Sequence, residues 1–393
     1  MKKSRTMVSG DDLSKVLSQE MIGGLDFLRA VAVLLVVVGH ISEGAGKYIP
    51  LLGDASGIGV GIFFVISGFL INHLLMNEFE RTGGLNIGSF YRRRCARLLP
   101  VFFLYVAVVV SVRIMKGQPV PWDAVVAALF YFINYHQAWT GAESNIVSHC
   151  WSLAVEEQFY FLWPMILVLL MKARRSVAHF LICGIALVWI WRVIVVLSGG
   201  SEAYLYRALE TRADGFLTGC LLSVLLRQRK NMEIFSGLMN LPFLTGGLII
   251  ALVLCIHGER YSVGVRYGVI MMIEQPLMAL ILLRTMLASN QGGVSGLLVN
   301  HPVMVLVGRT SYGIYLFHGL IGYTAMMAVM RLSDGNFPVS LACVLIVLVL
   351  TMWAVLRWFE TPARRWLAGP ATVHPPVDLP SAGVARLPIR AAV

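Results

Sequence analysis

The chain has 393 residues, of which 58% are hydrophobic and only 13% are charged, about half the charged fraction of a typical soluble domain. This composition excludes a soluble globular enzyme and predicts a polytopic, all-α membrane helix bundle. The net charge of +11 does not indicate nucleic-acid binding, because the lysines and arginines gather between apolar stretches, as in cytoplasmic loops of membrane proteins. The six cysteines are scattered without a C-x-x-C motif, so we expect neither a disulfide framework nor a metal site.

Eleven apolar stretches are candidate membrane spans, and they lie at about 25–41, 57–76, 98–115, 122–138, 151–171, 178–197, 211–226, 237–257, 266–287, 303–330 and 339–358. The basic segments between them indicate which stretch does not cross. The basic N-terminus lies in the cytoplasm, and the segments 172–175 and 227–230 return there only if 122–138 enters and leaves on the outer side. We therefore predict ten transmembrane helices, a re-entrant or interfacial helix at 122–138, and both termini in the cytoplasm.

The predicted domain organisation is simple. A polar cytoplasmic N-terminal tail, 1–24, precedes one membrane domain, 25–367, and a Pro/Ala-rich cytoplasmic tail, 368–393, which we expect to be disordered, follows it. We expect a multi-pass protein of the cell (inner) membrane. We expect no soluble catalytic domain, so any chemistry is expected to occur within the bundle.

Two ionisable residues interrupt the first span, LDFLRAVAVLLVVVGHI. Arg29 and His40 are about three helical turns apart, so both project from one face, about 16 Å apart along the axis. A charge at the centre of a membrane helix costs at least about 2.5–3.5 kcal/mol, so such residues usually face the bundle interior and mark a site. The alternative is an arginine that snorkels to one membrane surface and a histidine at the other end of the helix.

The second stretch, SGIGVGIFFVISGFLI, brings Gly57 and Gly61 into a G-x-x-x-G pattern. This pattern predicts close packing against a neighbouring helix. The Ser67-Gly68 pair is a point where we expect that the helix can unwind locally.

The segment FYRRRCARLLP follows and is predicted to be a cytoplasmic loop beside a span. It contains Arg92, Arg93, Arg94 and Arg97. Guanidinium groups bind phosphates in a bidentate fashion, so a nucleotide-like molecule is a candidate ligand of these four arginines. Plain positive-inside topology is the alternative explanation.

The fourth predicted span opens with HCWSLAVEEQFYFLWP. Ser152, Glu156 and Tyr160 share one face by their i, i+4, i+8 spacing. Because helix neighbours are about 100° apart, Glu156 and Glu157 cannot both face one site. We expect Glu156 to be the functional one and Glu157 to be a partner for an arginine or for water. The predicted topology places it at the outer end, level with His40. The alternative is an interfacial carboxylate pair beside a tryptophan anchor.

Two later segments also carry polar residues. RADGFLTG contains Arg212 and Asp214, which we interpret as a local ion pair. RTSYGIYLFH contains Ser311, Tyr315 and His318 at i, i+4 and i+7, which form one polar stripe. The stripe belongs either to a site or to interhelical hydrogen bonds worth about 0.6 kcal/mol each.

Together these segments resemble acyltransferase family 3, a family of integral-membrane O-acyltransferases, over about residues 25–365. The resemblance rests on GLDFLRAVAVLLVVVGH, GVGIFFVISGFLI, FYRRRCARLLP, WSLAVEEQFYFLWP, RADGFLTG, TSYGIYLFH and FETPARR, in this order. It implies about ten spans and transfer of an acyl group, usually acetyl, from acyl-coenzyme A (acyl-CoA) to a hydroxyl of a sugar, polysaccharide, lipid-linked saccharide or macrolide. The chain ends about 26 residues after Leu367, so it looks like the stand-alone form, without the hydrolase-like domain fused to some members.

Carried over to this sequence, the resemblance implies that Arg29 and His40 form an essential pair and that Arg94, Arg97 and Pro100 hold the cytoplasmic loop. It also implies roles for Glu156, Tyr312 and His318. Substrate binding is expected for five further residues: Trp151, Ser152, Tyr160, Ser311 and Tyr315.

The mechanism that follows uses acyl-CoA as a co-substrate rather than a tightly bound cofactor, with its phosphates near the four arginines. His40 takes the proton of the acceptor hydroxyl as that oxygen attacks the thioester carbonyl. Glu156 or His318 orients the imidazole or the sugar, and Arg29 stabilises negative charge on the coenzyme or thioester. An acyl intermediate on His40 and direct transfer both stay open. The expected partners are acyl-CoA, the hydroxyl acceptor and the lipid bilayer, with no nucleic acid and no metal.

The rival interpretation is a transporter or flippase for a glycolipid or a proton-coupled solute, because intramembrane Arg, His and Glu occur there as well. Against it, the two halves of the sequence show no inverted repeat of the kind that many transporters have. A non-catalytic scaffold would leave the polar stripes unexplained.

Overall fold

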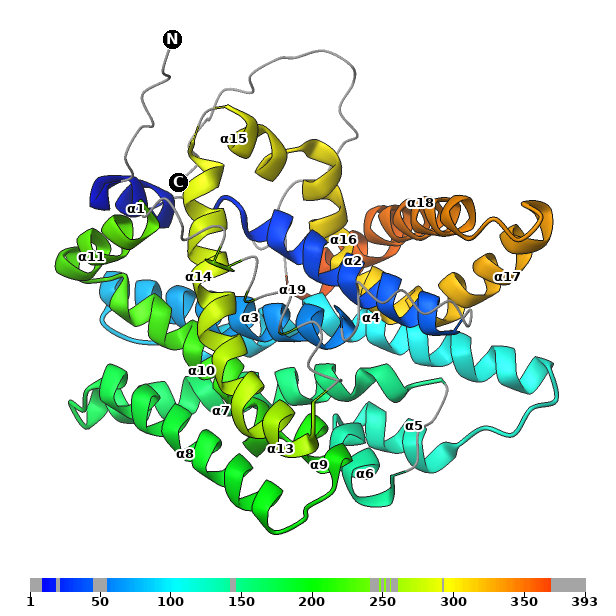
Figure 1. The fold of residues 1–393 in the computed structure, drawn as a ribbon, viewed down its shortest axis with the longest axis horizontal. Helices are drawn as coiled ribbons and strands as arrows, with labels where there is room; N and C mark the ends of the chain where they lie inside the picture. The colour runs from blue at the N-terminus through cyan, green and yellow to red at the C-terminus, as the bar shows by residue number, and fades with distance from the viewer. Residues whose placement is uncertain are drawn as a thin grey trace.

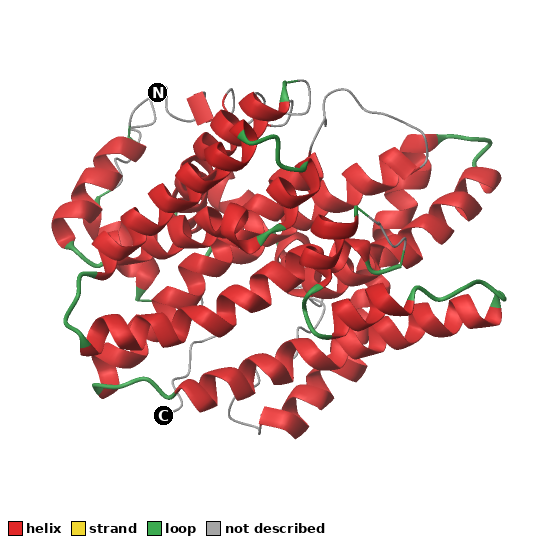
Figure 2. Cartoon of the chain, turned by 90° about the horizontal axis from the view of Figure 1, so that it is seen from below, coloured by secondary structure: helices red, strands yellow, loops and turns green. Residues whose placement is uncertain are grey.

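The computed structural model describes residues 9–18, 22–44, 55–141, 146–240, 261–291 and 293–368, with isolated positions between 247 and 255. Within these ranges the regular structure is helical, and Figure 2 shows helices joined by short turns. The longer helices are α2 (Leu25–Gly44), α3 (Ala55–Thr82), α4 (Ile87–Met115), α7 (Trp151–Lys172), α8 (Val177–Leu197), α10 (Leu209–Leu225), α14 (Met271–Ser289), α16 (Pro302–Phe317) and α18 (Phe337–Val355).

Shorter helices connect and extend these elements. They are α1 (Gly10–Leu17), α5 (Trp122–Leu129), α6 (Ile133–Thr140), α9 (Glu202–Arg207), α11 (Arg229–Met239), α13 (Val263–Val265), α15 (Val294–Val299), α17 (Tyr323–Leu332) and α19 (Thr361–Ala368). A 3₁₀ turn, η1 (Ser148–Cys150), precedes α7, and three π-helical turns join longer helices: η3 (Arg266–Ile270), η4 (His318–Gly322) and η5 (Leu356–Glu360).

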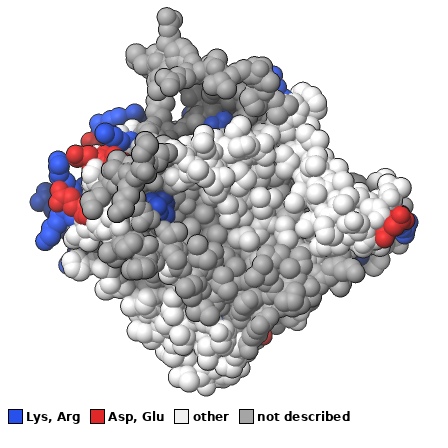
Figure 3. Space-filling view, turned by 45° about the horizontal axis from the view of Figure 1, so that its top comes forward, with Lys and Arg blue, Asp and Glu red and all other residues white. Residues whose placement is uncertain are grey.

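Eight helical segments of the described chain are long and apolar enough to cross a membrane. They correspond to eight of the ten predicted spans, so the chain is a multi-pass helical membrane protein. The predicted span 211–226 matches α10, a helix of 17 residues, and the predicted span 237–257 lies mostly outside the described residues. Figure 3 shows one broad face that is almost free of charge, as a surface in contact with lipid requires.

The stretch 122–138 does not form a spanning helix. It folds into α5 and α6, two helices of eight residues each, with a break at residues 130–132. A helix of this length is about 12 Å long, far short of the roughly 30 Å of hydrocarbon in a bilayer. The prediction that this stretch does not cross as one helix is confirmed.

The predicted N-terminal tail, 1–24, contains the ordered helix α1. Ser9 caps its first turn and forms a reciprocal capping box with Asp12. Leu13 and Val16 are fully buried, where α1 packs against α11 and α14 (Figure 1).

Helix α3 lies at the centre of the bundle and contacts α2, α10, α14 and α7. The predicted close packing along α3 occurs at Gly59 and Gly68, whereas a Cβ on Gly61 would meet its nearest atom only at 3.9 Å. A Cβ on Gly59 would lie 2.5 Å from a carbonyl oxygen of α2, and one on Gly68 would lie 2.0 Å from a carbonyl oxygen of α10, so only glycine fits at either crossing. Helix α3 is continuous through Ser67 and Gly68.

Candidate active site

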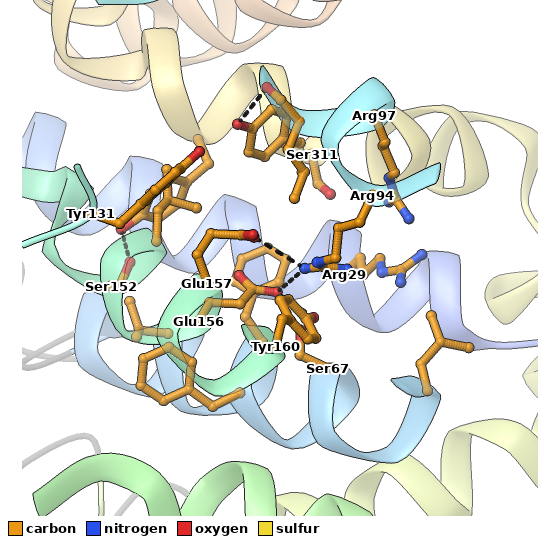
Figure 4. Close-up of a pocket in the computed structure, with 18 residues that line it drawn as sticks. Arg29, Ser67, Arg94, Arg97, Tyr131, Ser152, Glu156, Glu157, Tyr160 and Ser311 are labelled. Carbon is orange, nitrogen blue, oxygen red and sulfur yellow. Dashed lines mark hydrogen bonds and ion pairs between the residues drawn. The ribbon is translucent and has the colours of Figure 1, made fainter. Parts of the chain in front are cut away.

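A pocket of about 810 Å³, counting the space at its open mouth, lies among α2, α3, α4, α7 and α16 (Figure 4). Eight of the predicted site residues line it: Arg29, Arg94, Arg97, Ser152, Glu156, Tyr160, Ser311 and Tyr315. These residues come from four helices that are far apart in the sequence. The sequence analysis therefore identified most of the polar wall of the pocket.

The predicted basic loop is instead the beginning of α4, which starts at Ile87 behind the N-cap residue Asn86. Arg94 and Arg97 are three residues apart and so project from the same side of the helix, into the pocket. Arg92 and Arg93 are exposed and do not line the pocket. The structure thus divides the four arginines into two that line the pocket and two that do not.

Arg94 is held by both glutamates of α7. Its Nη2 lies 3.4 Å from Glu156 Oε1 and 3.3 Å from Glu157 Oε1, and its guanidinium stacks 3.0 Å above the Tyr160 ring centroid. The expectation that only one glutamate can face the site is wrong, because Arg94 lies between them and both side chains are long enough to reach it. Glu156 is therefore level with Arg94 rather than with His40.

Glu156 Oε1 also accepts hydrogen bonds from Ser67 Oγ and Tyr160 Oη, both at 2.6 Å. Together with Arg94, three donors converge on this one carboxylate oxygen. Arg29 lies in the same pocket, bound to Asp26 at 3.6 Å. Three arginines and two glutamates line the pocket, so its polar end carries an excess of positive charge.

His40 and His318 lie outside the pocket wall and contact each other. His40 Nδ1 is 3.0 Å from His318 Nε2, and the two rings are stacked with centroids 5.1 Å apart. His318 is buried and begins the π-helical turn η4, a feature that occurs often at functional sites. Of the two predicted partners of His40, Glu156 and His318, the structure places His318 against it.

The hydrogen bonds assign the tautomers of this pair. His318 Nδ1 lies 2.6 Å from the Tyr315 carbonyl oxygen, which can only accept, so this nitrogen carries the proton. In neutral His318 the Nε2 atom is then an acceptor, and His40 Nδ1 donates to it. The lone pair of His40 is consequently on Nε2, the nitrogen that can take a proton.

Tyr315 connects the pocket with the histidine pair. Its hydroxyl donates to the His149 carbonyl oxygen at 2.8 Å and accepts from Ser152 Oγ at 2.5 Å, while its own carbonyl holds His318. The His149 ring lies 5.0 Å from that of His318. Sequence reasoning missed His149, because it precedes α7 on the turn η1 and so belongs to no helical stripe.

Tyr131 is a second pocket residue that sequence reasoning missed. It occupies the break between α5 and α6 with φ = +56°, a left-handed conformation that costs a residue with a Cβ about 1–3 kcal/mol. Burial raises the pKa of its phenol well above the usual range, so the hydroxyl is neutral. The dipeptide signals of a turn, such as Asn-Gly, are absent here, and only the structure identifies the strained position.

Two other predicted groups lie elsewhere. Trp151 is buried against Tyr206, with ring centroids 4.8 Å apart, and does not line the pocket. The expected ion pair between Arg212 and Asp214 is wrong, since Asp214 binds Arg192 at 2.9 Å, with both side chains fully buried. Arg212 and Asp214 are two positions apart on one helix, so their side chains point to different sides of it, whereas Arg192 reaches Asp214 from α8. No cluster of metal-ligating side chains occurs within the described residues.

The fold and the pocket define a class of protein, a helical membrane protein with a charged pocket inside the bundle next to a histidine pair. The chain belongs to acyltransferase family 3, since the sequence profile of its acyltransferase domain matches residues 22–358. The site motifs predicted from the sequence all lie within that range.

Comparison with curated proteins finds relatives in Staphylococcus aureus. The chain is 29% identical over 380 residues to "Putative O-acetyltransferase SACOL0978" of strain COL, and 27% identical over 379 residues to O-acetyltransferase OatA of strain NCTC 8325. Each match covers 90% of this chain and 59% of the relative, so the chain spans less than two thirds of their length. No solved structure matches.

Proposed function

We propose that this protein is an O-acyltransferase, with acyl-CoA as donor and a hydroxyl of a saccharide, lipid-linked saccharide or macrolide as acceptor. The observation that carries the proposal is the arrangement around Tyr315. A pocket with three arginines at one end reaches Tyr315 at the other, and the histidine pair lies directly behind that residue. The family and the names of the relatives support acyl transfer to oxygen.

The donor binds with its phosphates at the arginine end of the pocket. Arg29, Arg94 and Arg97 supply guanidinium groups that match phosphate oxygens. Arg94 is already compensated by Glu156 and Glu157, and Arg29 is paired with Asp26, so Arg97 provides most of the net attraction.

The chemistry takes place at the Tyr315 end. His40 Nε2 takes the proton of the acceptor hydroxyl while its oxygen forms a bond to the thioester carbonyl carbon. The carbon–sulfur bond then breaks, and the coenzyme A thiolate leaves with the proton that His40 returns. His318 holds the His40 ring in the required tautomer, which makes it a positioning residue.

Release of free thiol from acetyl-CoA by the purified protein tests this function. We expect release to depend on an added hydroxyl acceptor and to be lost in His40→Ala. A protein that moves a glycolipid or solute across vesicles without releasing thiol would be a transporter, and the proposal would then be wrong.

We also propose that both termini face the cytoplasm, which places the arginine end near the compartment that supplies acyl-CoA. Accessibility tags inserted at 172–177 and 227–232 should both report the cytoplasmic side, because these segments are short and basic. An external report from either segment would contradict the proposed orientation.

A further inference from the structure

Tyr131 differs from the other residues of the described chain that adopt a left-handed backbone. Besides glycines, only Arg174 and Asp334 share this conformation, and both are exposed in turns between helices. Tyr131 instead lines the pocket. Strained residues concentrate where the surrounding structure holds them for a purpose, so the position of this ring calls for a functional explanation.

Two side-chain amides hold the strained bend. Gln158 Nε2, on α7, donates to the Tyr131 carbonyl oxygen at 2.7 Å and to Asn134 Oδ1 at 2.9 Å. Asn134 is fully buried and donates in turn to the Arg207 carbonyl oxygen at 3.2 Å. The Tyr131 ring stacks on Phe102 with centroids 5.2 Å apart. A hydrogen bond thus fixes the Tyr131 backbone, and the contact with Phe102 fixes one face of the Tyr131 ring.

The ring lies at the end of the pocket where the acyl group belongs. Figure 4 shows Tyr131 and Ser152 on one side of the pocket, and Arg29, Arg94 and Arg97 on the other. With phosphates at the arginines, the thioester points toward Ser152 and Tyr315, which are joined by a hydrogen bond. An acyl chain that extends further in this direction meets the side of the pocket that Tyr131 occupies.

We propose that Tyr131 closes the acyl end of the pocket and restricts the donor to a short acyl group such as acetyl. The inference rests on the proposed function, because it assumes that acyl-CoA occupies the pocket. It assigns a role in chain-length selection to the hairpin of α5 and α6, which presents Tyr131 to a pocket built by other helices. Tyr131 does not take part in the chemical step.

The test is a competition experiment on the purified full chain in lipid nanodiscs. Unlabelled acetyl-, butyryl-, hexanoyl- and octanoyl-CoA displace tritiated acetyl-CoA, so no acceptor has to be known. We expect the native protein to bind octanoyl-CoA more weakly than acetyl-CoA. Tyr131→Gly removes the ring at a position where glycine is unstrained. The affinity for octanoyl-CoA relative to acetyl-CoA should then rise by about tenfold or more, at roughly fourfold per methylene newly buried.

Two variants serve as controls. Tyr131→Phe keeps the ring and should keep the native chain-length profile. Arg174→Gly makes the same backbone change in an exposed turn, and the profile should again be native. If Tyr131→Gly cannot be purified, Tyr131→Asn replaces it, because asparagine tolerates the left-handed region.

The outcomes separate this inference from the proposed function. A native protein that does not bind acetyl-CoA at all contradicts the proposed function and removes the inference with it. A native protein that binds acetyl-CoA while Tyr131→Gly leaves the chain-length profile unchanged overturns the inference alone. Relaxed selection in Arg174→Gly would also overturn it, since general loosening of the bundle would then explain the effect.

Discussion

The arginine end of the pocket and the histidine pair both contain polar groups among apolar helices, but these groups are stabilised differently in the two regions. At the arginine end, Arg94 lies between two carboxylates and stacks on an aromatic ring. At the other end, His40 and His318 are linked by a hydrogen bond in which one imidazole donates and the other accepts, so both can be neutral. Neutral imidazoles avoid the cost of burying a charge, and a neutral His40 retains a lone pair for proton transfer.

This difference suggests a division of work between the two ends. A cluster with excess positive charge and an open mouth attracts an anionic ligand, whereas a neutral base next to a buried partner suits a step in which a proton moves. Tyr315 belongs to both ends, since its hydroxyl contacts Ser152 and its carbonyl contacts His318. Variants at the two ends should therefore affect different kinetic constants.

The largest effect is expected at the histidine end. His40→Ala removes the base, and turnover should fall by about 10²–10⁴-fold, while the affinity for acyl-CoA stays close to native because His40 does not line the pocket. Turnover by thiol release and binding by displacement of labelled acetyl-CoA measure the two quantities. Near-native turnover would assign the base to another group, and a large loss of donor affinity would show that the two ends are not separate.

The arginine end should show the opposite pattern. Arg97→Gln removes a charge-assisted bond to phosphate, worth about 1.5–3 kcal/mol, so the KM for acyl-CoA should rise by about ten- to a hundredfold while kcat changes little. Arg93→Gln is the matched control, because Arg93 is exposed and binds Glu78 at 3.7 Å. Both variants need a check of membrane orientation, since arginines near a span also set topology. Equal KM values in the two variants would move the donor site elsewhere.

Helical periodicity explains what could be predicted from the sequence. The three-residue spacing of Arg94 and Arg97, and the stripe that contains Ser311 and Tyr315, depend only on the geometry of one helix, and both features line the pocket. The resemblance to a known family added the order of the segments. These local signals were sufficient for the fold class and for most of the polar wall of the pocket.

Contacts between distant segments could not be predicted in this way. His40 and His318 are 278 positions apart, and Arg192 reaches Asp214 from a different helix, so neither pairing has a local signature. Glu157 was excluded by an argument about directions on an ideal helix, which ignores the reach of its side chain and the position of Arg94 between two carboxylates. Tyr131 lies at a break that Gln158 of α7 holds through the Tyr131 carbonyl oxygen, next to the packing of α6 on α7.

The smallest effect is expected from the carboxylates that compensate Arg94, and it should be a gain. A donor phosphate that binds Arg94 has to compete with Glu157, whose Oε1 is 3.3 Å from it. Glu157→Gln weakens this partly exposed ion pair, which is worth about 0.2–1 kcal/mol, so the Kd for acetyl-CoA should fall by roughly two- to fivefold with turnover nearly unchanged. Glu80→Gln is a control, because Glu80 pairs with Arg227 outside the pocket and should leave the Kd as it is. Weaker binding in Glu157→Gln would mean that this carboxylate orients Arg94 toward the donor instead of competing with the donor phosphate. The arginines and glutamates of the arginine end would then act together as one preorganised binding site.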